Sequence, residues 1–224
     1  MKAFFLTGTD TEIGKTFSAC ALLHAWRSAG LRATAYKPVA AGAEYVDGIW
    51  SNEDARRLHA ASSEGPTITD INPVCLRSPI APHIAAAEEG VALELPALLK
   101  GFSRLSEQAD RVLVEGVGGF RVPLGADFDS ADLAVALDLP VLLVVGLRLG
   151  CINHALLSAE AIAARGLTLA GWIGNRPLPA PMLHEAENIE TLRRLIKAPC
   201  LGILPHASAP SAKETLSALD ITRL

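Results

Sequence analysis

A chain of 224 residues has room for one α/β domain with a sizeable core, whereas two domains would both be small. Half of the residues are hydrophobic and only 5% are aromatic, so we expect an aliphatic core of buried parallel strands covered by helices. The net charge of −4, and the lack of any basic run longer than Arg193-Arg194, argue against a nucleic-acid groove.

The cysteines and the apolar runs give no sign of secretion or of a membrane span. None of the four cysteines forms a C-x-x-C pair, so we expect reduced thiols in a cytoplasmic protein and no zinc site. The apolar run at 4–6 is too short for a signal peptide. The longest apolar region, residues 131–147, contains two aspartates and a proline, and it predicts a helix, a turn and a buried strand.

The first informative stretch runs from Thr7 to Thr16 and reads TGTDTEIGKT, between an apolar run at 3–6 and a helix-forming segment at 17–29. This order of strand, glycine-bearing turn, Gly-Lys-Thr and helix is typical of a phosphate-binding P-loop. The turn offers backbone N–H groups to an anion, Lys15 can reach the outer phosphates, and the Thr16 hydroxyl can bind magnesium.

Two features of this loop depart from the usual pattern. Five residues separate Gly8 from Gly14, where four are usual, and Asp10 and Glu12 are unusual neighbours for a phosphate chain. The alternative is an ordinary strand-to-helix turn with a chance Gly-Lys-Thr. The flanking strand and helix favour the P-loop.

The next elements place two charged side chains near the same sheet edge. A strand over 31–36 ends at Lys37, and open α/β sheets bind ligands at the carboxyl ends of their strands. After a loop over 40–51, Asn52 can cap a helix whose first turn contains Asp54. Taken alone, Lys37 could be a solvated lysine and Asp54 a helix-dipole acid.

A second informative stretch follows the buried strand 111–114, which ends at Glu115 and the glycine turn 116–119. An apolar strand followed at once by an acid is the pattern of the metal-side carboxylate in P-loop enzymes. An exposed acid before a glycine turn is the alternative reading.

The remaining pattern alternates strands with helices. We expect a weak strand at 74–76, helices at 83–88 and 95–105, a strand at 140–146, a helix at 155–165 capped by Asn153, a strand at 167–173, a helix at 182–197, a strand at 200–204 and a tail helix at 211–219. This alternation predicts one domain over 1–224, an α/β fold of the P-loop NTPase type with a mostly parallel, doubly wound sheet flanked by helices.

The polar residues converge on one chemistry. Thr16, Asp54 and Glu115 supply the hard oxygen ligands that Mg²⁺ prefers, and Lys15 and Lys37 can balance the charge of a transferring phosphoryl group. The residues themselves therefore indicate nucleotide hydrolysis or phosphoryl transfer, without naming the acceptor.

Five blocks make the chain resemble the dethiobiotin synthetase family. They are GTDTEIGKT (8–16), YKPVA (36–40), VEGVGG (114–119), LGCINH (149–154) and AGWIGN (170–175). They run in the family's order across nearly the whole chain, and the first block carries the family's own longer loop.

The resemblance implies an ATP- and Mg²⁺-dependent ligase of biotin synthesis in the cytoplasm. It would close the ureido ring of dethiobiotin from 7,8-diaminononanoate and CO2, through a carbamate and a mixed carbamic–phosphoric anhydride. The partners would be these small molecules and a second subunit, with neither nucleic acid nor membrane.

The family's roles map onto residues of this chain. The catalytic residues would be Lys37, Lys15 and Thr11. The ATP-binding residues would be Glu12, Ile13, Gly14, Lys15, Thr16, Phe17, Asp54, Glu115, Gly116, Val117, Gly118, Asn175, Arg176, Leu204, Pro205 and His206. The metal ligands would be Thr16, Asp54 and Glu115. The substrate-binding residues would be Thr11, Lys37, Ala41, Gly150, Cys151, Ile152 and Asn153.

Three further expectations belong to this resemblance. Family members are homodimers, so 150–153 would bind the substrate carboxylate in the partner's site. Ala41 replaces the serine that is common in the family and cannot supply its hydroxyl. Lys37 should act through charge and not through packing, so its removal should leave the fold intact.

The two acids of the loop, Asp10 and Glu12, are expected to lie beside the substrate's two amines.

Two rival classes of protein share the P-loop. A partition- or switch-type ATPase, acting as a binding module, would carry an extra lysine early in the loop, where this chain has none. A cobyrinate-amidating enzyme would need a glutaminase domain, for which 224 residues leave no room.

Overall fold

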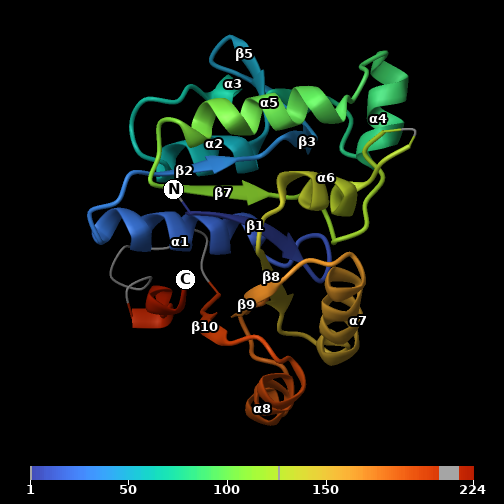
Figure 1. The fold of residues 1–224 in the computed structure, drawn as a ribbon. Coiled ribbons are helices and arrows are strands. Elements are labelled where there is room, and N and C mark those ends of the chain that lie inside the picture. Colours follow the sequence, from blue (N-terminus) through green and yellow to red (C-terminus); the bar gives the residue numbers. More distant parts are fainter. Residues whose placement is uncertain (1, 126, 207–216) are drawn as a thin grey trace.

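A computed structural model describes residues 2–125, 127–206 and 217–224. Its main sheet has six strands, all parallel, and Figure 1 shows them from β2 near the top to β10 near the bottom. In spatial order they are β10 (Cys200–Leu204), β9 (Leu169–Asn175), β8 (Val141–Gly146), β1 (Lys2–Gly8), β7 (Arg111–Glu115) and β2 (Ala33–Tyr36). This confirms the predicted α/β class.

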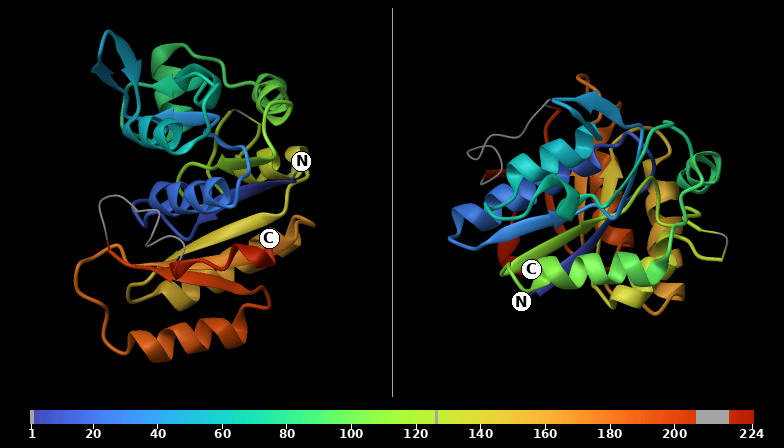
Figure 2. Two further views of the ribbon diagram at one scale, coloured as in Figure 1. Left: turned by 90° about the vertical axis from the view of Figure 1, so that its left-hand side faces the viewer. Right: turned by 90° about the horizontal axis from the view of Figure 1, so that it is seen from above.

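The helices cover both faces of this sheet (Figures 1 and 2). They are α1 (Lys15–Ser28), α2 (Glu53–Ala61), α3 (Ile68–Ile71), α4 (Pro82–Glu89), α5 (Leu95–Ser106), α6 (Ser130–Leu137), α7 (Cys151–Ala164), α8 (Glu185–Leu195) and the short 3-10 helix η1 (Ile221–Arg223).

Alternation along β1 shows how the sequence produces two cores. Phe4 and Leu6 pack into the cluster that contains α1, whereas Ala3 and Phe5 pack into the cluster that contains α5 and α6. Successive side chains of a strand point to opposite faces, so a continuous apolar run is what a strand buried on both faces requires. The third cluster joins β8 and β9 to α7 and α8.

Most predicted elements are present, and the region after β2 is the main correction. The expected loop 40–51 contains most of strand β3 (Val39–Ala41), which pairs with β6 (Val74–Leu76), and a hairpin of β4 (Glu44–Val46) and β5 (Ile49–Ser51). The short helix α3 was not predicted. Of the expected tail helix, residues 211–216 lie outside the described residues.

The crossing from β2 to β3 positions the site. The pairing of β2 in the main sheet ends at Tyr36, and Pro38 has no N–H to continue the ladder, so the chain joins β6 in a separate two-stranded sheet from Val39 on. Lys37 therefore lies at the carboxyl end of β2, where it and Ala41 line a cavity.

Candidate active site

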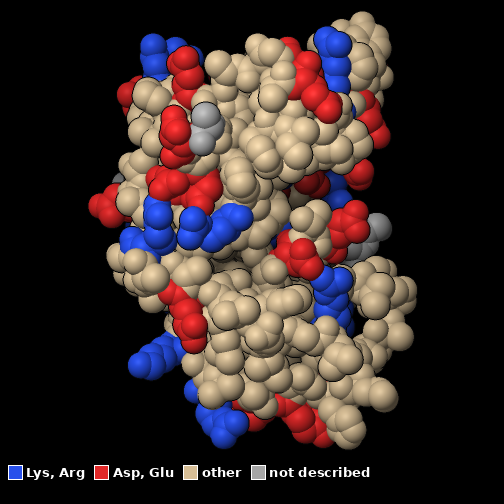
Figure 3. All heavy atoms as spheres, turned by 90° about the vertical axis from the view of Figure 1, so that its right-hand side faces the viewer, with Lys and Arg blue, Asp and Glu red and all other residues tan. Residues whose placement is uncertain are grey.

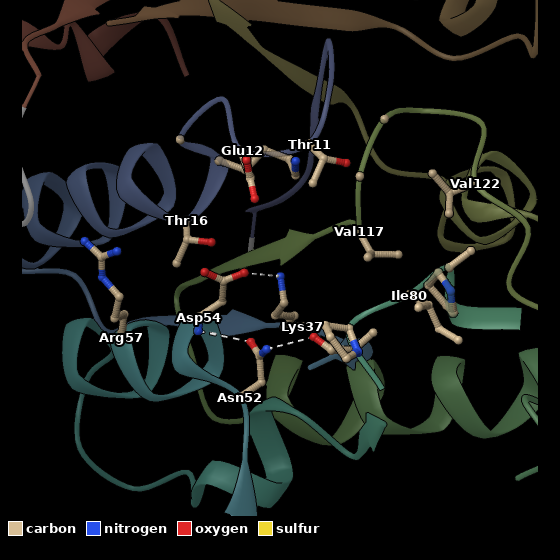
Figure 4. A pocket seen from close by; sticks show the side chains of 18 of the residues that line it. Thr11, Glu12, Thr16, Lys37, Asn52, Asp54, Arg57, Ile80, Val117 and Val122 are labelled. Atoms are coloured by element: carbon tan, nitrogen blue, oxygen red, sulfur yellow. Dashed lines mark hydrogen bonds and ion pairs between the residues drawn. The ribbon is translucent and has the colours of Figure 1, made fainter. Parts of the chain in front are cut away.

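A cavity of about 770 Å³ opens where the segments after β1, β2 and β7 meet. Figure 4 shows its polar and charged side chains, among them Thr16, Asp54 and Lys37, toward one end and Ile80, Val117 and Val122 toward the other. Figure 3 views the molecule from the side to which the strands of Figure 1 point, and basic and acidic side chains lie close together there. The cavity can thus receive a ligand with one charged and one apolar part.

The loop before α1 is shaped to receive an anion. Gly14 lies at the N-cap of α1 with a φ of 86°, and no side chain caps the helix. The first N–H groups of α1 therefore have no capping side chain and suit a phosphate. This conformation favours glycine, and a Cβ at Gly14 would lie only 2.2 Å from Nδ2 of Asn175.

Asn175 has a structural contact that the sequence did not reveal. Its Nδ2 donates a hydrogen bond to the backbone oxygen of Ile13 at 2.8 Å, which ties the end of β9 to the P-loop. Its Oδ1 is buried and has no hydrogen-bond partner within the described residues. Asn175 therefore holds the loop through its Nδ2, while its Oδ1 can still accept a hydrogen bond.

Lys15 is folded back onto its own loop. Its Nζ donates to the backbone oxygen of Asp10 at 2.9 Å. Burial is the main cause that lowers the pKa of Lys15, and the charge of Lys37 adds to it, against the opposing pull of Glu115. A phosphate chain would supply the counter-charge that this ammonium group lacks.

The two unusual acids of the loop separate in the structure. Glu12 lines the cavity, whereas Asp10 does not. The Asp10 carboxylate forms an ion pair with Arg148 and accepts a hydrogen bond from the N–H of Thr11 at 2.8 Å. The Asp10 carboxylate thus contributes to the shape of the loop, and of the two acids only Glu12 lines the cavity that would receive the amines.

Lys37 lies at the centre of the charged end of the cavity. Its Nζ is 2.6 Å from Oε1 of Glu115 and 3.2 Å from Oδ2 of Asp54. Burial by itself would lower the pKa of Lys37, but the two carboxylates outweigh it and raise this pKa. Lys37 is therefore a buried, charged ammonium group, 3% exposed, and not a solvated one.

The Asp54 carboxyl is held in its ionised form. Burial would raise the pKa of Asp54, but the charge of Lys37, the neighbouring Thr16 hydroxyl and a hydrogen bond from Lys37 lower it. As predicted, Asn52 caps α2, because its side chain accepts from the N–H of Asp54 at 3.0 Å. The cap fixes the helix start that carries this acid.

Three oxygen side chains meet here as the sequence predicted, and they fit a magnesium ion. The hydroxyl of Thr16 donates to Oε1 of Glu115 at 2.8 Å, and Asp54 lies beside both. Glu115 is fully buried, which excludes the exposed-acid reading, and its Oε2 has no hydrogen-bond partner within the described residues. A buried carboxylate oxygen without a partner is a suitable ligand for a hard cation.

The ion would need further ligands. Across the described residues, no group of three or more His, Cys, Asp or Glu side chains could hold a metal. An ion at Thr16, Asp54 and Glu115 would take its other ligands from phosphate and water, as Mg²⁺ usually does.

The residues expected at the adenine end lie along the neighbouring strands. Leu204 pairs with Asn175 in the register of β10 and β9, and Pro205 and His206 follow it. Arg176 forms an ion pair with Glu185 of α8 at 2.7 Å. The sheet brings this group together, although none of it lines the cavity described above.

The segment 150–153 stands apart from the cavity of its own chain. Helix α7 begins at Cys151 and its N-cap is Gly150, with a φ of 95°, so the prediction that Asn153 caps this helix is wrong. Asn153 is exposed within the first turn, and the preceding Leu149 is 96% exposed.

Some lining residues were missed at the sequence level. Arg57 lines the cavity three residues after Asp54 and so shares its face of α2, a spacing that could have revealed it. Ile80 and Val122 come from loops with no periodic signal. Ala41 lines the cavity, as expected for the position that is often serine.

A family profile described as an AAA domain matches residues 2–213. The chain is 61% identical over 220 residues to an ATP-dependent dethiobiotin synthetase of Aromatoleum aromaticum, covering 98% of this chain and 97% of the relative.

Solved structures show similarity of fold alone. The septum site-determining protein MinD of Pyrococcus horikoshii, complexed with Mg-ADP, matches with a TM-score of 0.57 and 16% identity over 97% of this chain and 86% of its own. Chloroplast FtsY of Physcomitrella patens matches with a TM-score of 0.52 and 14% identity over 96% of this chain, which spans 64% of that protein.

Proposed function

The chain belongs to the dethiobiotin synthetase family, and from this premise we propose that the cavity is the active site of its ATP-dependent, ring-closing reaction. The enzyme is a ligase of biotin synthesis that forms dethiobiotin from 7,8-diaminononanoate, CO2 and ATP. The observation that carries the site assignment is the meeting of Lys37, Glu115 and Asp54 beside the P-loop.

The chemistry has three steps. One substrate amine adds to CO2 and loses a proton, which gives a carbamate. An oxygen of the carbamate then attacks the γ-phosphorus of ATP, ADP departs, and a mixed anhydride forms. The second amine attacks the carbamate carbon, loses a proton, and expels phosphate. Because both amines belong to one molecule, the ring closure is intramolecular.

Two lysines serve the phosphoryl transfer in this proposal. Lys37 is kept charged by Glu115 and Asp54, so it can stabilise the carbamate and the charge that develops on the transferred group. Lys15 exchanges the backbone oxygen of Asp10 for the β- and γ-phosphates. The uncapped N–H groups at the start of α1 receive the remaining phosphate oxygens.

Thr16, Asp54 and Glu115 would hold the Mg²⁺ that accompanies ATP and neutralises part of its charge. The phosphate chain of ATP would be lined by Phe17, Gly116, Val117 and Gly118. At the adenine end, Asn175 would present its unpaired Oδ1, with Arg176, Leu204, Pro205 and His206 nearby.

The substrate would occupy the other end of the cavity. Glu12 and Thr11 would face the amines, and Ala41, Ile80 and Val117 would pack against the aliphatic chain. Its carboxylate would be bound by 150–153 of a second subunit, because these residues lie outside their own chain's cavity and the uncapped start of α7 suits an anion. We therefore propose a homodimer with shared sites.

We propose a cytoplasmic location from the four free cysteines, which suit a reducing compartment. The described part of the chain holds no helix that is both long and apolar enough to cross a membrane.

The direct test is product formation. The enzyme, incubated with diaminononanoate, bicarbonate, ATP and Mg²⁺, is expected to release ADP and phosphate together with dethiobiotin, identified by mass spectrometry. Omission of the diamine controls for simple ATP hydrolysis. If ADP forms without the cyclic urea, the chain is instead a nucleotide-hydrolysing protein of the switch type.

A further inference from the structure

The described strands of the main sheet provide no hydrogen-bond partners for the backbone of Lys37. Lys37 follows β2, an edge strand, and the pairing of β2 with β7 ends at Tyr36 opposite Val114. The next residue, Pro38, has no N–H to donate. Yet Lys37 is only 3% exposed, so its backbone groups need partners from elsewhere in the fold.

The segment from Ile71 to Val74 supplies these partners. The N–H of Lys37 donates to the backbone oxygen of Ile71 at 2.8 Å. On the other side, Nδ2 of Asn72 donates to the backbone oxygen of Lys37 at 2.7 Å and to that of Val74 at 3.0 Å. Both peptide groups next to the Lys37 Cα are therefore held by one short segment.

Asn72 does not line the cavity, but it is itself 6% exposed. Asn72 lies between α3 and β6. Directly after it, β6 pairs with β3, with Val39 opposite Val74. An apolar residue here would deprive the buried backbone oxygen of Lys37, and also that of Val74, of this donor. The amide thus couples the edge of the main sheet to the small sheet.

From this geometry we propose that Asn72 is a positioning residue for ring closure. It fixes the Cα of Lys37 so that the ammonium group lies between Glu115 and Asp54. A lysine side chain has four rotatable bonds, so backbone restraint is needed to hold its Nζ in one place. The inference rests on the proposed role of Lys37 in phosphoryl transfer.

The first experiment separates positioning from general stability. In Asn72→Ala, we expect kcat for dethiobiotin formation to fall about 10- to 100-fold, while KM for ATP changes less than about threefold. The matched control is Ser62→Ala. The Ser62 hydroxyl is also buried. It accepts a hydrogen bond from the N–H of Ala35, which lies in β2 two residues before Lys37.

Ser62→Ala is expected to lower the melting temperature while kcat stays within about twofold of the parent. Asn72→Ser, which keeps a short donor, is expected to recover part of the lost kcat and serves if Asn72→Ala does not fold. A folded Asn72→Ala enzyme with the parent's kcat would overturn the proposal, and so would the parent's kcat in Asn72→Ser if Asn72→Ala does not fold. So would a loss of kcat in Ser62→Ala equal to that in Asn72→Ala.

The second experiment tests whether Asn72 acts through Lys37. In a Lys37→Gln background, Asn72→Ala should cause no further loss of kcat, because the group that it positions is gone. A further loss as large as in the parent would refute the inference. Full activity of Lys37→Gln would reject the proposed role of Lys37. If Lys37→Gln is inactive but Asn72→Ala keeps the parent's kcat, only the inference about Asn72 is rejected.

Discussion

The ion pair with Glu115 ties Lys37, the residue proposed to serve phosphoryl transfer, to the stability of the fold as well. The sequence suggested that Lys37 acts through charge and not through packing, but the side chain is buried against a fully buried carboxylate. Removing one member of such a pair costs about 3–5 kcal/mol, because the other charge remains buried and unpaired. We therefore expect Lys37→Ala to fold, as the sequence predicts, but with reduced stability. Lys37→Gln, which keeps a donor for Glu115, is a better probe than Lys37→Ala.

A second buried residue, Cys20, gives the protein a measurable response to alkaline pH. Burial raises the pKa of this thiol from 9.0 to about 12. The unfolded chain loses the proton near pH 9 and the folded chain near pH 12. The stability that the protonated thiol contributes is therefore complete below pH 9 and is lost as the pH rises from 9 toward 12.

We predict that the free energy of unfolding of the parent falls by about 1 kcal/mol more than that of Cys20→Ala between pH 9 and pH 10. Urea unfolding followed by circular dichroism at both pH values measures this difference. Parallel pH profiles for the two proteins would contradict the assigned burial of the thiol.

At the scale of elements, the P-loop and α1 depend on Gly14. The residue combines a positive φ with a Cβ position that Asn175 already occupies. We predict that Gly14→Ala weakens the binding of a non-hydrolysable ATP analogue at least about tenfold, because the loop must shift away from the end of β9. Isothermal titration calorimetry measures this binding.

Gly30→Ala is the matched control for this change. Gly30 follows the other end of α1 with a φ of +81°, and a Cβ there would meet nothing within 4 Å. Both substitutions carry a backbone strain of about 1–2 kcal/mol, but only Gly14→Ala should affect nucleotide binding. Equal effects on binding would show that strain in α1, and not the shape of the loop, controls the site.

At the scale of the whole molecule, the two ends of the proposed substrate site lie in different places of one chain. Lys37 is buried beside the cavity, while Asn153 is exposed at the start of α7 and away from it. The proposed homodimer with shared sites would join the two ends across the subunit interface. Subunit mixing can test that proposal directly.

We predict that Lys37→Gln and Asn153→Asp are each nearly inactive, and that mixing them restores about a quarter of the parent's activity. Random exchange makes half of the dimers mixed, and each mixed dimer has one site with both native residues. The mixture is assayed after subunit exchange under mild denaturant. A mixture that stays inactive, or a fully active monomer in sedimentation, would exclude shared sites.

The sequence by itself determined the elements and the kind of site. Each of these signals is local: an apolar run ends in Glu115, Gly-Lys-Thr opens a helix, and Asn52 precedes the helix start that carries Asp54. Because carboxyl ends of parallel strands meet at one sheet edge, these signals also predicted which side chains converge. The prediction failed where the signal was weak, at the hairpin of β4 and β5 and at the start of α7.

Only the tertiary structure decided how those side chains are held. The strand order, the burial of Lys37 between two acids, the bond from Asn175 to Ile13 and the pairing of Asp10 with Arg148 all join residues far apart in the chain. Such contacts depend on packing and on the sharing of buried donors and acceptors across the whole fold, which no local pattern records. The meeting of Lys37, Asp54 and Glu115 could thus be predicted from the sequence, whereas the charge state of these groups and their supports, Asn72 among them, required the fold.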